Sequence, residues 1–122
     1  MPYSREHIDQ ARSNALFLTT LDPKSTQHPD WAVTVAFYTA VHLVDAYLAS
    51  SSIHPNSHGE RREAVVRHLG PVAAHYLALY SESRRTRYSC QNVTNVQAQL
   101  QIQTHYMPVR DGLCSQLGIL SV

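Results

Sequence analysis

Arginines gather in two segments of this chain, the first of which also contains histidines, and both residue types do chemistry on phosphate. In the first segment, HGERREAVVRH, Arg61 and His68 lie seven residues apart, two turns along one helical face. An imidazole can take the proton of a ribose 2′-hydroxyl, while a guanidinium stabilises the added phosphate charge. His68, Arg61 and Arg62 are therefore the catalytic candidates if the protein cleaves RNA. The alternative is a solvated helix face with Glu60 and Glu63 as ionic partners.

The second segment, SRRTRY, closes a helical pattern with a group of cations and a tyrosine. Arg84, Arg87 and Tyr88 share one helical face because they are three and four residues apart. Guanidinium groups beside an aromatic ring suit phosphate contact combined with base stacking. The other interpretation is that these cations oppose the dipole at a helix C-terminus. Under the first interpretation all three are binding residues.

His42 stands midway along the apolar segment FYTAVHLVDAYL and is a further binding candidate. Tyr38 precedes it by four residues and Asp45 follows it by three, so the three project from one side of a helix. Asp45 can orient the imidazole, or His42 is a core histidine satisfied by a neighbour. Since an unpaired buried polar group costs about 1–3 kcal/mol, we expect a buried His42 bonded to the HPNSHGER turn or the SRRTRY end.

His54 and His58 form an H-x-x-x-H pair within HPNSHGER. Zinc needs three or four converging ligands, and His42 and His68 are the other histidines considered for such a site. However, the pair straddles Pro55 and a helix start, so both imidazoles do not share a helical face. Capping or surface histidines are the favoured interpretation, and we expect no metal and no cofactor. His58 remains a binding candidate.

Helices must position these residues, because apolar residues recur at helical spacing and no period-two alternation is sustained. The helical patterns cover residues 4–21, 30–50, 57–69, 71–88 and 93–117. The second is apolar on more than one face, which is typical of the central helix of a bundle. We predict an all-α, up-and-down bundle of four to five helices, forming a single domain over residues 1–122.

Several residues mark the expected helix ends. Ser4 is expected to cap the first helix. Ser57 and Glu60 make a capping-box pattern at the third. Pro71 suits the first turn of the fourth helix. Pro108 falls inside the last pattern and is expected to kink or split it.

Composition agrees with an ordered globular protein. A chain of 122 residues, 43% hydrophobic and 16% charged, fits one domain with a sizeable core. The net charge of +1 gives no global field toward nucleic acid or membrane. Lys24 is the only lysine. The arginine bias reflects genomic base composition, or it reflects the planar guanidinium fork that suits phosphate and carboxylate.

A few residues indicate the redox state of the cysteines and the cellular location of the protein. Cys90 and Cys114 are too few and too far apart for a disulfide scaffold, and each is expected to be a small buried hydrophobe. The polar amino terminus is unlike a signal peptide. Asp45 and His42 interrupt the longest apolar run, which we expect to be too short to span a membrane. We therefore expect a cytoplasmic protein.

Together, the segments FYTAVHLVDAYL, HPNSHGER and SRRTRY resemble the HEPN superfamily (higher eukaryotes and prokaryotes nucleotide-binding). The resemblance covers roughly two-thirds of the chain and implies a four- or five-helix bundle, often a homodimer. Many members are metal-independent endoribonucleases of toxin, RNA-processing or antiviral defence systems, with an R-x4-6-H motif at the dimer interface. Others lack that motif and act as nucleic-acid-binding or interaction modules.

The R-x4-6-H motif of active members usually lies in the C-terminal half. Here Arg110 has no histidine after it, and the matches are Arg61 or Arg62 with His68, earlier in the chain. We therefore expect a homodimeric module that binds RNA, a nucleotide or a partner protein through its His/Arg/Tyr cluster. The alternative is a metal-independent endoribonuclease of a toxin–antitoxin or defence system.

Overall fold

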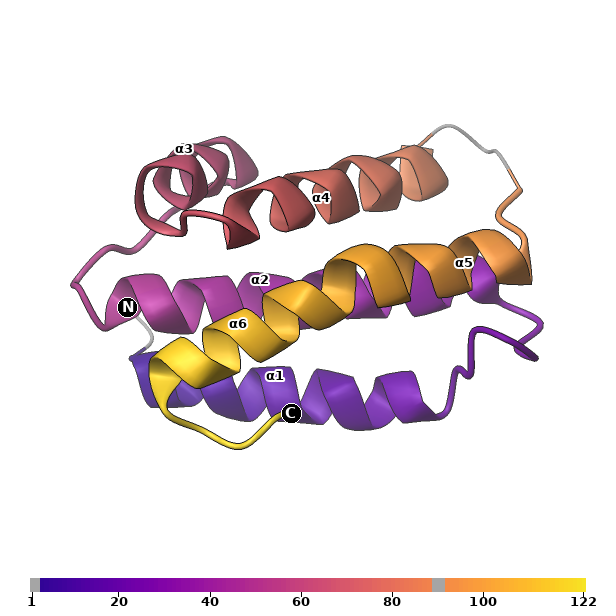
Figure 1. Cartoon of the computed structure of the whole chain (residues 1–122), viewed down its shortest axis with the longest axis horizontal. Coiled ribbons are helices and arrows are strands. Elements are labelled where there is room, and N and C mark those ends of the chain that lie inside the picture. The colour runs from indigo at the N-terminus through magenta and orange to yellow at the C-terminus, as the bar shows by residue number, and fades with distance from the viewer. Residues whose placement is uncertain (1–2, 89–91) are drawn as a thin grey trace.

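The computed structural model describes residues 3–88 and 92–122, and every regular element among them is helical (Figure 1). The first half contains α1 (Ser4–Thr19), α2 (Pro29–Ala49) and α3 (His58–His68). The second half contains α4 (Val72–Tyr88), α5 (Asn95–Gln101), the π-helical turn η1 (Ile102–Tyr106) and α6 (Met107–Leu117). The predicted all-α class is confirmed, and the expected helix ends lie within about two residues of the observed ones.

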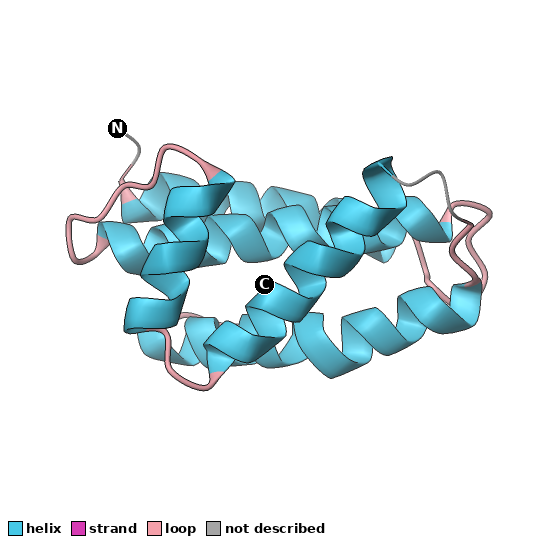
Figure 2. Ribbon diagram, turned by 90° about the horizontal axis from the view of Figure 1, so that it is seen from above, coloured by secondary structure: helices cyan, strands magenta, loops and turns pink. Residues whose placement is uncertain are grey.

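The long helices alternate in direction along the longest axis of the molecule. Helices α1, α2 and α4 and the rod made of α5, η1 and α6 run up and down, and short α3 lies beside the start of α4 (Figure 1). Helix α2 contacts α1, α3, α4, α5, η1 and α6, which makes it the centre of the bundle. The loops gather at the two ends (Figure 2).

Helix α2 supplies much of the hydrophobic core. Its fully enclosed side chains include those of Val33, Phe37, Leu43 and Val44. By length and composition alone, this helix of 21 residues is long and apolar enough to cross a membrane. The expectation that its apolar run is too short to span a membrane is therefore wrong. However, 72% of its most apolar stretch is buried inside the bundle, as in the core helix of a soluble protein.

Two of the expected helix caps differ in detail from the prediction. Ser4 does not cap α1: its hydroxyl instead donates to the carbonyl of Ala46 at 2.8 Å and ties α1 to α2. Ser57 does cap α3, accepting the backbone N–H of Glu60 at 3.1 Å. The Glu60 carboxylate reaches back to the N–H of Asn56 rather than to that of Ser57.

Pro108 neither splits nor ends the last helical rod. A proline inside an α-helix clashes with the carbonyl four residues earlier, here that of Thr104. The chain instead widens into η1, where the N–H of Met107 donates to the carbonyl of Ile102, five residues back. Pro108 then occupies the first turn of α6, where it is tolerated. The π-helical turn therefore accommodates Pro108 without the clash that an α-helix would produce.

A side chain at the start of α5 holds the loop between α1 and α2 in place. The Asn95 amide donates to the carbonyls of Pro23 and Thr26, both at 2.9 Å, so the α1–α2 loop is tied to the start of α5. Cys114 is buried, as predicted, whereas Cys90 lies outside the described residues.

Candidate phosphate- and base-binding site

A buried ion pair links α2 to α3. The Asp45 carboxylate accepts from Nε and Nη2 of Arg61 at 2.7 and 3.0 Å, and the two side chains are only 10% and 11% exposed. A two-pronged contact of this kind is strong and fixes the plane of the guanidinium. The buried hydroxyl of Tyr76 lies beside Arg61 but makes no hydrogen bond of normal geometry. Burial raises the pKa of Tyr76, so this phenol stays protonated.

The third nitrogen of the same guanidinium reaches a histidine. Nη1 of Arg61 lies 3.2 Å from Nδ1 of His58, the first residue of α3. The His58 ring packs 5.8 Å from the ring of Phe37 and 5.7 Å from that of Tyr80, measured between centroids. The ring of Tyr38 is 6.5 Å away. His58 therefore sits among aromatic rings supplied by α2 and α4.

Guanidinium groups cover the outer faces of these rings. Cζ of Arg62 lies 4.8 Å from the centre of the Tyr80 ring. Arg87 lies 5.2 Å from the Tyr38 ring and 5.3 Å from the Tyr88 ring, and it donates to the Tyr38 hydroxyl. Attraction between a cation and an aromatic face is worth about 0.5–1 kcal/mol at exposed sites and more when desolvated. These contacts hold the arginines in place.

We call this group of side chains from α2, α3 and α4 the arginine–aromatic cluster. Its members are Phe37, Tyr38, His58, Arg62, Tyr80, Arg84, Arg87 and Tyr88. An open pocket of about 530 Å³ lies against it, lined by Arg62, Tyr80, Ser81, Arg84, Arg85 and Tyr88.

The charge of the cluster is unbalanced. Arg61 is neutralised by Asp45 and Arg85 by Glu82. Among residues 3–88 and 92–122, by contrast, Arg62, Arg84 and Arg87 form no ion pair with a carboxylate. Two guanidinium groups without a carboxylate partner in this part of the chain, those of Arg62 and Arg84, therefore line the pocket, and the third, that of Arg87, packs on the ring of Tyr88 in its wall.

Comparison of the chain with protein-family models, with curated proteins and with solved structures found no match. The function is therefore inferred from the geometry and charge of the arginine–aromatic cluster.

The structure brings together most of the residues that the sequence analysis assigned to binding. His58, Arg84, Arg87 and Tyr88 all belong to the cluster, and Arg62, a catalytic candidate, lies beside them. They come from two separate helices, α3 and α4, that pack against α2.

His42 lies apart from the cluster, and its predicted partner is wrong. It is half-buried, and its Nδ1 lies 3.1 Å from Nδ1 of His7 in α1, not against the HPNSHGER turn or the SRRTRY end. The reason is that α1 packs along α2 on the side where His42 projects. Asp45 does not orient His42 either, since both carboxylate oxygens accept from Arg61. Burial and the nearby His7 lower the pKa of His42.

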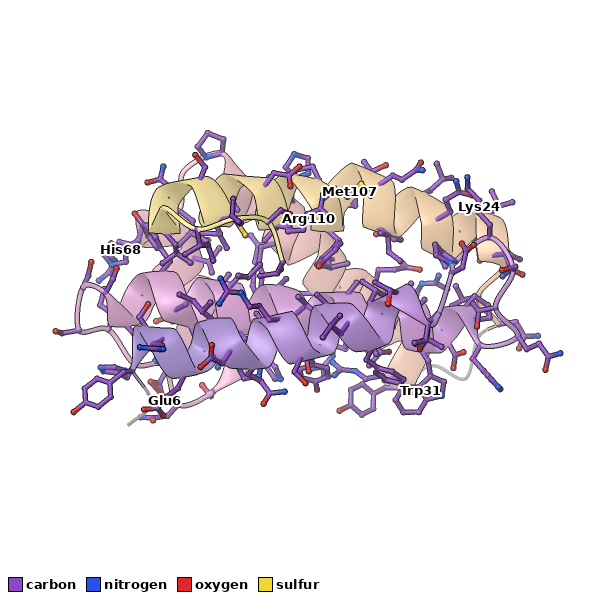
Figure 3. The ribbon with its side chains drawn as sticks, turned by 90° about the horizontal axis from the view of Figure 1, so that it is seen from below. Glu6, Lys24, Trp31, His68, Met107 and Arg110 are labelled. Carbon is purple, nitrogen blue, oxygen red and sulfur yellow. The ribbon has the colours of Figure 1, made fainter. Side chains whose placement is uncertain are left out.

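The three catalytic candidates are not assembled around one point. His68 is exposed at one end of the bundle, away from Lys24 and Trp31 at the other end (Figure 3). It lines a separate pocket of about 380 Å³, whereas Arg61 is turned into its contact with Asp45. Among the described residues, no group of three or more His, Cys, Asp or Glu side chains is arranged to hold a metal ion.

The sequence pattern did not predict the aromatic rings around His58 or the Asp45–Arg61 ion pair. Phe37 and Tyr80, whose rings pack against His58, occupy ordinary apolar positions in the helical pattern. The adjacent pair Phe37–Tyr38, which places rings on two neighbouring faces of α2, is the signal that could have indicated them. The Asp45–Arg61 pair is separated by 16 residues and has no local signature. A second histidine pair was not predicted either: the Nδ1 atoms of His75 and His105 lie 3.1 Å apart between α4 and η1.

Proposed function

We propose that this chain is a HEPN-like helical module that binds RNA or a nucleotide at the arginine–aromatic cluster. The observation that carries the proposal is the placement of Arg62, Arg84 and Arg87. All three lie on aromatic rings and have no carboxylate partner among the described residues. Arg62 and Arg84 line a pocket of about 530 Å³, and Arg87 packs on the ring of Tyr88 in its wall.

The chemistry of such a surface fits an anionic ligand that also carries a flat base. Guanidinium groups donate paired hydrogen bonds to phosphate oxygens. The Tyr88 ring is 71% exposed and offers a face on which a base can stack. Stacking of a base on an aromatic side chain contributes about 1–3 kcal/mol, with little sequence preference. The site therefore suits unpaired RNA or a free nucleotide.

The HEPN-like character of the proposal is supported by the origin of the cluster residues. The three segments that carry the resemblance meet in one place: Tyr38 comes from FYTAVHLVDAYL, His58 from HPNSHGER, and Arg84, Arg87 and Tyr88 from SRRTRY. Segments that are up to about 50 residues apart in sequence thus converge on one surface, as expected of parts that serve one ligand.

Binding is proposed in preference to cleavage. The histidine of the R-x4-6-H match, His68, lines a different pocket, and Arg61 is engaged by Asp45. An acid–base pair needs its members within hydrogen-bond reach of one reacting group, and this arrangement does not provide that.

The test is fluorescence anisotropy with a short, labelled, mixed-sequence single-stranded RNA, with unlabelled AMP as competitor. Arg62→Gln and Arg84→Gln should each weaken binding. Each should also lower the slope of log affinity against log salt by about 0.7. Arg5→Gln, an exposed arginine on α1, is the matched control and should change neither the affinity nor its salt slope by a comparable amount.

Two outcomes would overturn the proposal. If neither RNA nor AMP binds, the cluster serves a partner protein instead. If the purified protein cleaves the RNA in EDTA and His68→Ala abolishes the cleavage, the chain is a metal-independent ribonuclease.

A further inference from the structure

The two ring nitrogens of His58 have different surroundings. Nδ1 lies 3.2 Å from Nη1 of Arg61. Nε2 has no hydrogen-bond partner among residues 3–88 and 92–122. A guanidinium has only donors and stays charged at all ordinary pH values. Nδ1 of His58 must therefore accept the bond, which leaves the imidazole proton on Nε2.

Arg61 cannot easily turn away from this contact. Its Nε and Nη2 edge is occupied by both oxygens of Asp45, at 2.7 and 3.0 Å, and the pair is about nine-tenths buried. Because the guanidinium is planar, fixing that edge also fixes the direction of Nη1. A continuous chain of contacts thus runs from Asp45 on α2 through Arg61 to His58 at the start of α3.

The surroundings of His58 also oppose its protonation. The charged and titratable groups that face it are Arg61 and Arg62 on α3, Tyr38 and Asp45 on α2, and Tyr80 and Arg87 on α4. Burial lowers the pKa of His58, and Arg61, Arg87 and Arg62 lower it further, with Asp45 acting in the opposite direction. A proton on Nδ1 would also point at the N–H of Arg61, so protonation has to break that contact.

We propose that Asp45 and Arg61 are positioning residues that hold His58 as a neutral imidazole, whose Nε2–H is the hydrogen-bond donor for an acceptor oxygen of the ligand. The inference rests on the proposed function and deepens it. The arginines supply the positive charge, while His58 supplies one uncharged donor from a ring fixed among Phe37, Tyr38 and Tyr80.

The tautomer can be measured on the full chain without any ligand. Two-bond proton–nitrogen correlation spectra of the ¹⁵N-labelled protein distinguish Nε2–H, Nδ1–H and doubly protonated imidazoles, and His58→Gln assigns the signals. In the wild type we expect the neutral ring to be the single Nε2–H tautomer, and the ring to take up its second proton at a lower pH than an ordinary histidine does. A Nδ1–H tautomer, or titration of His58 near its ordinary pKa of about 6.5, would overturn the proposal.

Two variants separate positioning from the mere presence of charge. Arg61→Gln alone leaves the Asp45 carboxylate buried and unpaired, which endangers folding. Asp45→Asn with Arg61→Gln removes both charges, and in this variant we expect His58 to lose its single tautomer and to titrate closer to pH 6.5. Arg61→Lys with Asp45 intact keeps a positive charge without the planar fork, and we expect a low pKa but mixed tautomers. An unchanged tautomer in both variants contradicts the positioning role.

Binding of the labelled RNA provides the functional readout. The Asp45→Asn/Arg61→Gln variant should bind about threefold to tenfold more weakly, as expected for one misdirected hydrogen bond. Its affinity should also gain a pH-dependent step, stronger in acid, that is absent from both the wild type and His58→Gln. A double variant that binds as the wild type does at every pH would overturn the role of the pair. If no RNA binds but the tautomer is as expected, the proposed function fails while the positioning of His58 stands.

Discussion

Nδ1 of His7 lies 3.1 Å from Nδ1 of His42, and this contact joins α1 to the central helix α2. One imidazole nitrogen must donate and the other accept, so the contact is lost when both rings are protonated. His75 and His105 repeat the arrangement between α4 and η1, also at 3.1 Å. Two of the bundle's interhelical contacts therefore depend on neutral histidine.

The first prediction is that the bundle loses stability in mild acid. Burial and, secondly, the partner histidine lower the pKa of His42 and of His105. The pKa in the folded state lies below the unfolded value of about 6.5, so the unfolded chain binds more protons below that pH. The free energy of unfolding should fall as pH drops from about 6.5 toward the folded pKa, by at most about 1.4 kcal/mol per pH unit for each histidine.

Urea denaturation at a series of pH values measures this slope. The variant His7→Gln/His42→Gln removes one pair and should have a shallower slope than the wild type over the same range. His68→Gln, which changes an exposed histidine, is the control and should keep the wild-type slope. A free energy of unfolding that does not vary between about pH 5 and 7 would contradict the prediction.

The second prediction concerns the cost of breaking the Asp45–Arg61 pair. Arg61→Ala should lower the free energy of unfolding by about 3–5 kcal/mol, because a buried carboxylate loses its partner. Asp45→Leu combined with Arg61→Met replaces both charges with apolar side chains and should recover most of that loss. The measurement is urea denaturation at pH 7. Additive effects of the single substitutions at the two positions would show that the pair is not coupled.

Much of the fold could be predicted because its signals are local. Ser57 caps α3 through the N–H of Glu60, three residues away, and that spacing is visible in the sequence. Arg84, Arg87 and Tyr88 share a face for the same local reason, and the structure places them together. Both relationships are set within about one turn of helix, so no knowledge of packing is needed to find them.

The contacts of the site could not be predicted because they depend on which helices surround α2. This helix is buried on nearly every side, so its apolar pattern does not indicate which face meets α1 and which meets α3 or α4. Tyr38, His42 and Asp45 follow one another at helical spacing, yet they contact three different elements: Arg87 on α4, His7 on α1 and Arg61 on α3. The spacing along α2 indicates that the three side chains share one side of the helix, but it does not indicate which residues they contact.

The third prediction is a homodimer that uses the apolar end of α1. Leu16 and Phe17 are 71% and 54% exposed, and Trp31, at the start of the next helix, is also exposed. These residues lie where α1 ends and α2 begins, and exposed large apolar side chains at one end of a bundle are typical of an interface. Light scattering over micromolar concentrations should give twice the chain mass, and Phe17→Asp should give the monomer. A wild-type monomer throughout that range would rule out this dimer.

The fourth prediction separates stacking from phosphate contact at the proposed site. Tyr88 presents a largely exposed ring next to Arg84 and Arg87. Tyr88→Leu should weaken binding of the labelled RNA by about 1–3 kcal/mol, the contribution of one stacked base. Because no charge is removed, the slope of log affinity against log salt should stay at its wild-type value.

The matched control for stacking is Tyr3→Leu, which removes an equally exposed tyrosine at the start of α1. It should leave the affinity unchanged, whereas Arg84→Gln should lower both the affinity and its salt slope.

Arg84 also contacts the Tyr88 ring, so the double variant Tyr88→Leu/Arg84→Gln should lose less affinity than the sum of the single losses. Full additivity would mean that ring and guanidinium bind independently. A changed salt slope in Tyr88→Leu would mean that the ring serves to hold the arginine, not to stack a base.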